Sequence, residues 1–292
     1  MTKPILHTFS CLIIGLILLL NSELQAQDYY SFIPLSTSSY QGNMISTDDN
    51  GNLLIAAKSN LTKLDMDGNY LSHYFPLFQG KISCIDAKDP RRILLYYRQY
   101  SYVQFLNQEL ANAASLSIYS INSRPEPVDL NNINLAYTTL VCLDDNNESY
   151  WIYDANSTDI VLIDKDNQID FKADALDQLM DEDPNPNFMI MENGRLFINN
   201  PSTGVYIFDE NGSFVKILPL MGLRKIQVVK DMLFYTTNSS LAAHNLVTGE
   251  ESYSPLPLFI FYDWAIGQFS KPMRINFLTQ DGVKIYSLDK MK

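Results

Sequence analysis

Cysteine, histidine and basic residues are scarce in this sequence. Three cysteines and three histidines among 292 residues are too few for a disulfide-built scaffold, and they argue against a zinc site, where several ligands must converge. Lysine and arginine number 21 against 33 acids, a formal net charge of −12. This acidity disfavours binding to nucleic acid, whose phosphates require a basic surface, and docking on anionic lipid head groups.

The N-terminus has the features of a targeting segment. Lys3 supplies a positive start, Cys11–Leu20 is almost wholly apolar, and Ala26 is a small residue at a cleavage-type position. We predict a signal peptide over residues 1–26. A membrane anchor is the weaker alternative, because the apolar run is shorter than the ~20 residues that span a bilayer. We therefore expect an exported chain, in the periplasm or associated with the outer membrane, with no membrane insertion after cleavage.

Aromatic residues are abundant, with 18 Tyr and 15 Phe, and this enrichment favours strands. Six similar segments recur along the chain, and each consists of two short apolar stretches around a polar loop. The six pairs are 52–58 with 61–65, 92–98 with 102–106, 150–153 with 160–163, 195–200 with 205–209, 232–237 with 241–245, and 274–278 with 283–287.

Another short apolar stretch precedes most pairs, and a turn such as Asp67-Gly68 with a fourth stretch follows several of them. Four antiparallel strands recurring at roughly 40-residue spacing predict the blades of a β-propeller. We predict an all-β, six-bladed propeller as one domain over 27–292, with the strand Tyr29–Leu35 joining the last blade to close the ring. A β-sandwich is the alternative, but it gives no reason for six similar units.

Two insertions interrupt the repeat, near 122–136 and 172–187, and the second contains a predicted short helix, Ala173–Met180. Both join an outer strand to the next inner strand, so they should emerge on one rim, where loops on a rigid scaffold often bind partners. The predicted partner-binding residues on this rim are charged: Arg124, Glu126, Asp129, Asp177, Asp181, Glu182 and Asp183.

Polar residues near the ends of the inner strands predict a channel mouth. The candidates are Asp86, Asp144 and Glu192, together with Trp264 at the start of the last inner strand. A ring of such acids is conceivable as a calcium site, but acids at strand ends are also ordinary turn formers. Cys84 and Cys142 lie in similar apolar contexts on neighbouring inner strands, and we expect buried thiols, with a disulfide as the alternative.

No motif in the sequence indicates a metal, a cofactor or a catalytic set. Asp65–Asn69 and Asp164–Gln168 imitate the start of a calcium loop, but they lack the glycine and the glutamate that an EF-hand requires. We predict hairpin turns there instead. The Gly-x-Ser-x-Gly pattern of a nucleophile elbow does not occur, so we assign no catalytic residue, no metal ligand and no cofactor.

The segments Asn200–Gly212 and Leu218–Val228 resemble exported β-propeller proteins of Bacteroidota, and the blades are more remotely similar to NHL and sensor-type propellers. The resemblance implies the propeller fold and an envelope location, and it carries no catalytic motif. The sequence therefore favours a non-catalytic module that binds another envelope protein. The alternatives are a propeller that senses a small molecule or glycan at the channel mouth, and a calcium-dependent, lactonase-like hydrolase.

Overall fold

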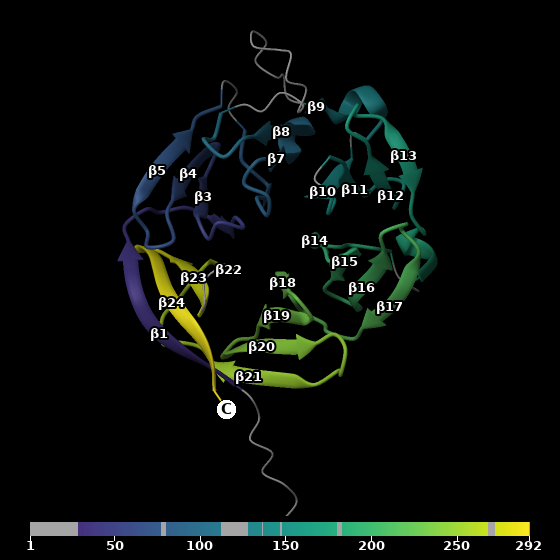
Figure 1. Ribbon diagram of the computed structural model, residues 1–292. Coiled ribbons are helices and arrows are strands. Elements are labelled where there is room, and N and C mark those ends of the chain that lie inside the picture. The colour runs from purple at the N-terminus through teal and green to yellow at the C-terminus, as the bar shows by residue number, and fades with distance from the viewer. Residues whose placement is uncertain are drawn as a thin grey trace, which may run out of the picture.

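A computed structural model describes residues 29–76, 80–111, 128–135, 137–146, 148–179, 183–267 and 272–291. The predicted signal peptide lies outside these residues. Six four-stranded antiparallel sheets form a ring in which strand order follows chain order, from an inner to an outer strand (Figure 1). This confirms the predicted six-bladed β-propeller.

The first three blades contain the strands β2 to β13, and in each blade the first strand is the innermost. Blade 1 consists of β2 (Met44–Thr47), β3 (Leu53–Ala57), β4 (Asn60–Leu64) and β5 (Tyr70–Tyr74); blade 2 of β6 (Cys84–Asp86), β7 (Ile93–Tyr97), β8 (Tyr102–Leu106) and β9 (Val128–Asp129); and blade 3 of β10 (Thr138–Leu143), β11 (Tyr150–Asp154), β12 (Ile160–Ile163) and β13 (Ile169–Lys172).

The last three blades contain β14 to β24, and β1 is the outermost strand of the sixth. Blade 4 consists of β14 (Phe188–Glu192), β15 (Arg195–Asn200), β16 (Gly204–Asp209) and β17 (Phe214–Leu218); blade 5 of β18 (Ile226–Val229), β19 (Met232–Thr236), β20 (Ser240–Asn245) and β21 (Glu251–Pro255); and blade 6 of β22 (Asp263–Gly267), β23 (Met273–Thr279), β24 (Gly282–Met291) and β1 (Tyr29–Ser38).

The two ends of the described chain close the ring. β1 pairs antiparallel with β24 from Tyr29 opposite Met291 to Ser38 opposite Val283, with a bulge between Pro34 and Ser36. The closing strand predicted from the sequence is therefore confirmed, and it extends three residues beyond Leu35. Because a strand from the N-terminal part completes a sheet begun by the C-terminal part, the ring cannot open without breaking this pairing.

Six apolar clusters hold the blades together, one between each pair of neighbouring blades. Between blades 3 and 4, Trp151 is fully buried and packs with Met191, Tyr206 and Phe208. Alternate residues of a strand face opposite sides of its sheet. Each central strand therefore buries side chains against both neighbours, which explains its continuous apolar sequence.

The prediction that both insertions join an outer strand to the next inner strand is wrong for the first one, which contains the outer strand of blade 2, whereas the second lies between β13 and β14 within one residue of its predicted bounds. Val128 and Asp129 fall in the first but form β9, the outer strand of blade 2, and a 3₁₀ helix (η2, Leu130–Ile133) follows directly. In the second, the predicted helix is a 3₁₀ turn (η3, Leu176–Leu179) whose Leu176 is buried between blades 3 and 4. A further 3₁₀ helix, η1 (Arg98–Tyr100), separates β7 from β8.

The Asp-rich turns are built by their own carboxylates. Asp65 Oδ1 accepts hydrogen bonds from the backbone N–H groups two and four residues further on, at 2.9 and 2.8 Å, and Asp164 and Asp209 do the same in blades 3 and 4. Slight burial acts to raise the pKa of Asp65, but the hydrogen bonds of the turn outweigh it and lower that pKa. These turns are the hairpins predicted at 65–69 and 164–168.

Candidate functional site: the central channel and its two mouths

The six inner strands enclose a cavity of about 350 Å³ on the axis of the ring. They run in the same direction, because near their starts Ile45 N–H donates to Asp263 Oδ2, and near their ends Thr47 Oγ1 donates to the Ile266 carbonyl. The cavity therefore has one mouth where the strands begin and another where they end. Partly exposed apolar side chains line the part between them: Met44, Ile85, Phe188 and Ile190.

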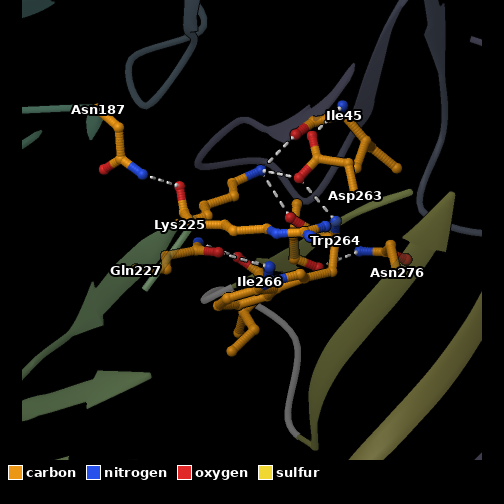
Figure 2. Close-up of polar contacts among 10 residues, drawn as sticks. Ile45, Asn187, Lys225, Gln227, Asp263, Trp264, Ile266 and Asn276 are labelled. Carbon is orange, nitrogen blue, oxygen red and sulfur yellow. Dashed lines mark hydrogen bonds and ion pairs between the residues drawn. The ribbon is translucent and has the colours of Figure 1, made fainter. Parts of the chain in front are cut away.

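Side chains join the inner strands, which do not pair with one another as sheets. The Gln227 amide donates to the Ile266 carbonyl at 2.6 Å and accepts from the Ile266 N–H at 2.7 Å, so it completes the inner edge of β22 as a strand would (Figure 2). Asp86 Oδ2 accepts from the Leu143 N–H at 2.8 Å in the same way. Side-chain hydrogen bonds of this kind thus link the inner strands of blades 5 and 6 and those of blades 2 and 3.

The mouth where the strands begin carries Arg98, Arg224 and Lys225, which we call the basic mouth. Lys225 Nζ lies 2.9 Å from Asp263 Oδ1 and donates to the carbonyls of Ile45 and Trp264 at 2.9 and 2.7 Å (Figure 2). It therefore ties blade 5 to blades 6 and 1, and its charge is balanced by Asp263.

The two arginines of the basic mouth have fewer polar partners than Lys225. Arg98 is exposed and donates one guanidinium N–H to the Thr139 carbonyl. Arg224 is exposed and has no hydrogen-bond or ion-pair partner for its guanidinium among the residues that the structure describes. Positive charge therefore remains available at this mouth.

The mouth where the strands end carries Asp49, Asp86, Asp145 and Glu192 around one cation, Lys88, and we call it the acidic mouth. Lys88 Nζ lies 2.9 Å from Asp145 Oδ1 and 3.0 Å from Glu192 Oε2. The Asp49 N–H donates to the Lys88 carbonyl at 2.9 Å, so the end of the inner strand of blade 1 lies beside Lys88. Two of the four carboxylates thus pair directly with the ammonium group, and Asp49 and Asp86 lie near enough to interact with its charge.

Burial perturbs the acids of this mouth. Removal from bulk water raises the pKa of Glu192, an effect that Lys88 only partly offsets, and burial likewise raises the pKa of Asp86 and of Asp49. Burial acts to lower the pKa of Lys88, but Glu192 and Asp145 outweigh it and raise that pKa. Asp49, Asp86 and Glu192 therefore bind a proton more readily than surface carboxylates would.

The four residues predicted to line one channel mouth lie at three different places in the structure. Asp86 and Glu192 lie together at the acidic mouth. Asp144 lies in a turn beside it and accepts the Trp151 indole N–H at 2.9 Å, as a turn former would. Trp264 lies at the opposite end and is 2% exposed, packed between blades 5 and 6 and not lining the cavity.

The structure describes three of the seven residues that the sequence predicts for partner binding on the rim. Asp177 and Asp183 are exposed on the connection from blade 3 to blade 4. Asp129 is used internally, because its Oδ1 accepts from the N–H of Asn131 and caps η2. Arg124, Glu126, Asp181 and Glu182 lie outside the described residues.

Sequence reasoning did not find Arg98, Arg224, Lys225, Lys88, Asp49 or Asp145 as a set. They come from all parts of the chain and meet only because the inner strands converge on one axis. The available signal was positional: each lies within a few residues of the start or end of a predicted inner strand, or of the strand that pairs with it.

The two cysteines of the inner strands are free thiols. The Cys84 thiol on β6 donates to the Val141 carbonyl on β10 at 3.2 Å, and Cys142 is 1% exposed. Burial raises the pKa of Cys84 to about 12 and that of Cys142 well above its ordinary value. Such thiols are poor nucleophiles. The predicted buried thiol is confirmed for Cys142, whereas Cys84 is only partly buried and lines the cavity.

In the described parts of the chain, no group of three or more His, Cys, Asp or Glu side chains is placed to hold a metal ion. The two described histidines do not line the cavity: His244 bonds to Glu251 and His73 to the Tyr70 hydroxyl. The same residues include no helix long and apolar enough to cross a membrane.

An exposed apolar segment lies beside the basic mouth, on the connection from blade 5 to blade 6 (residues 256–262). Its side chains alternate: Leu258, Ile260 and Tyr262 are 105%, 82% and 58% exposed, whereas Phe259 and Phe261 pack against the core between blades 5 and 6. The Phe259 ring lies 5.3 Å from that of Phe277. The segment is therefore anchored, and it still presents apolar side chains to solvent.

The fold and the channel together define a six-bladed β-propeller. No family model matches the chain, and neither does any curated protein. Solved structures with a similar fold include a streptogramin B lyase, at 13% identity with a TM-score of 0.58, covering 92% of this chain and 100% of that one. Another is a Bacteroides thetaiotaomicron protein of unknown function, at 12% identity with a TM-score of 0.60, covering 90% and 74%.

A third similar structure is PorZ, a surface component of the type-IX secretion system of Porphyromonas gingivalis. It is 9% identical with a TM-score of 0.53, and the match covers 90% of this chain but only 39% of PorZ. At such identities the likeness extends to the fold alone, because β-propellers carry many unrelated functions.

Proposed function

We propose that the protein is a non-catalytic interaction module of the cell envelope. It binds a partner protein through the face that surrounds the basic mouth. The observation that carries the proposal is the anchored apolar segment 256–262, since monomeric proteins rarely hold neighbouring apolar side chains fully exposed without an interaction to bury them. The export and envelope location rest on the predicted signal peptide and on the resemblance of Asn200–Gly212 to exported propellers of Bacteroidota.

The chemistry of this face indicates what kind of partner it fits. Leu258, Ile260 and Tyr262 provide an apolar anchor of the kind that dominates interface energetics. Arg98 and Arg224, close to the channel axis, favour acidic groups next to the apolar contact. Asp177 and Asp183, further out on the same face, suit basic groups at the periphery. The expected partner surface is therefore apolar with acidic neighbours, within a basic rim.

A non-catalytic role agrees with the chemistry of the channel. Its thiols have raised pKa values, its histidines are elsewhere, and its acids are shared around Lys88. None of these groups is arranged as a nucleophile with a neighbouring base.

Site-specific photo-crosslinking in the cells that produce the protein tests the proposal. A photoreactive amino acid placed at Leu258 or at Ile260 should yield adducts of one common mass. Val247 is the matched control, because it is also apolar and 73% exposed but lies on the turn between β20 and β21. The proposal is refuted if positions 258 and 260 give no adduct, or if position 247 gives the same one.

A further inference from the structure

We propose that the central channel binds a free, single-chain amphipathic anion, with its head group at the basic mouth and its aliphatic chain along the axis. The proposal rests on one juxtaposition: a narrow, largely apolar cavity has two arginines with guanidinium donors to spare at one end and carboxylates at the other. The ligand lies inside the ring and the proposed protein partner outside it, and both would contact Arg98 and Arg224.

The dimensions of the cavity suit an elongated small molecule. Its volume of about 350 Å³ lies at the lower end of the range for ligand sites. The inner strand β14 has five residues, which corresponds to a length of roughly 16 Å along the axis. A small volume spread over such a length leaves room for one extended chain, and a two-chain lipid would not fit.

The wall between the mouths is largely apolar, although Ser46 and Gln227 also line it. Met44, Ile85 and Ile190 are each partly exposed, and all three line the cavity. An alkyl chain in the channel would remove these surfaces, and its own, from water. Each buried methylene then strengthens binding by about fourfold.

The position of the anionic head group follows from which basic side chains still have hydrogen-bond donors to offer. Lys225 already has Asp263 and two carbonyl acceptors, so its charge is largely used. Arg224 has no guanidinium partner in the described chain, and Arg98 uses one N–H on Thr139. A guanidinium offers several N–H donors in one plane and binds carboxylates or sulfates in bidentate fashion. Arg98 lies on blade 2 and Arg224 on blade 5, and either one can therefore hold an anionic head at the rim of the cavity.

The opposite end fixes the direction of binding. At the acidic mouth the ammonium of Lys88 pairs with Asp145 and Glu192, and Asp49 and Asp86 add two more carboxylates near it. An anion at that end would meet repulsion, whereas the methyl end of an aliphatic chain carries no charge. A cationic amphiphile would have to place its head group at the acidic mouth, where Asp145 and Glu192 are already paired with Lys88.

Titration calorimetry of the purified mature chain with octanoate, decanoate and dodecanoate, below their micelle concentrations, tests the proposal. Dodecanoate should bind saturably at one molecule per chain, with affinity rising about fourfold per methylene along the series. Arg224→Glu should weaken dodecanoate binding at least tenfold, and Ile190→Trp, which fills the channel, should do the same.

Lys58→Glu is the matched control, because Lys58 is exposed on the turn between β3 and β4 and does not line the cavity. It should leave the affinity within twofold. Arg224 is itself exposed, so its variant should fold as the parent does, and the melting temperature checks this. Absent saturable binding, equal binding of dodecylammonium, or unchanged affinity in both Arg224→Glu and Ile190→Trp would overturn the proposal.

Discussion

The contacts of Lys225 predict how strongly side chains tie the inner strands together. Its ammonium lies 2.9 Å from Asp263 and donates to two backbone carbonyls, and the two side chains are only 18% and 15% exposed. In Lys225→Met all three contacts are lost while most of the packing remains. Breaking a fully buried ion pair costs about 3–5 kcal/mol.

The expected cost here is smaller, about 2–3 kcal/mol, because Asp263 keeps two backbone donors and some solvent. These donors are the N–H groups of Ile45 and Trp264. Denaturant unfolding measures the loss, provided that the dependence on denaturant concentration stays the same. Lys81→Met is the control: Lys81 is exposed, and its loss should change stability by less than about 0.5 kcal/mol.

A double-mutant cycle separates the energy of the Lys225–Asp263 ion pair from that of the other contacts of the two side chains. Asp263→Asn removes the negative charge and should also destabilise the protein. The double variant Lys225→Met with Asp263→Asn should then cost less than the sum of the single changes, because no buried charge is left unpaired. Strict additivity, or a loss below about 1 kcal/mol for Lys225→Met, would refute the view that this contact joins three blades.

Three other changes test separate parts of the fold. Lys63→Met should cost about 3–5 kcal/mol in denaturant unfolding, because Lys63 and Asp48 form a pair at 3.0 Å that is 4% and 0% exposed. Gly282→Ala should lower the melting temperature and expose the closing seam to protease, because φ is +122° and a Cβ would lie 2.0 Å from the Ser38 carbonyl oxygen. Glu251→Gln should flatten the acid limb of the stability-against-pH curve. Partial burial acts to raise the pKa of Glu251, but hydrogen bonds from its tyrosine and histidine partners outweigh the burial and hold this pKa below the ordinary 4.5. The ionised Glu251 therefore stabilises the fold fully above pH 4.5, and this stabilisation is lost as the pH falls through the lowered pKa.

The ring was predictable because its information is local and repeated. Each blade can be recognised in the sequence by apolar stretches of strand length and by turns such as Asp65–Asn69, in which the Asp65 carboxylate accepts hydrogen bonds from the backbone of the turn. The closing strand β1 was also predictable, because a final blade without an outer strand needs one from elsewhere. The outer strand β9 was missed, since a two-residue strand inside a polar stretch leaves no periodic signal.

The channel was harder to predict, because its residues meet only through the closed ring. Lys88 pairs with Asp145 and Glu192, which are distant in sequence, and next to Asp89 it reads as part of an ordinary turn. Trp264 illustrates the opposite error. It is next to Asp263, which lines the cavity, but successive strand residues face opposite ways, and its indole packs toward blade 5. The start of an inner strand is therefore not enough to place a side chain in the channel.

The acidic composition is also explained by the structure, and the explanation changes where function is sought. Asp65, Asp164 and Asp209 each use their carboxylate to bind the backbone of their own turn, so part of the acidic excess serves to build hairpins. Acids are thus poor markers of function in this protein. The most informative charge is Arg224, because its guanidinium lies beside a largely apolar cavity and has no partner among the described residues, whereas Arg98 also donates to the Thr139 carbonyl.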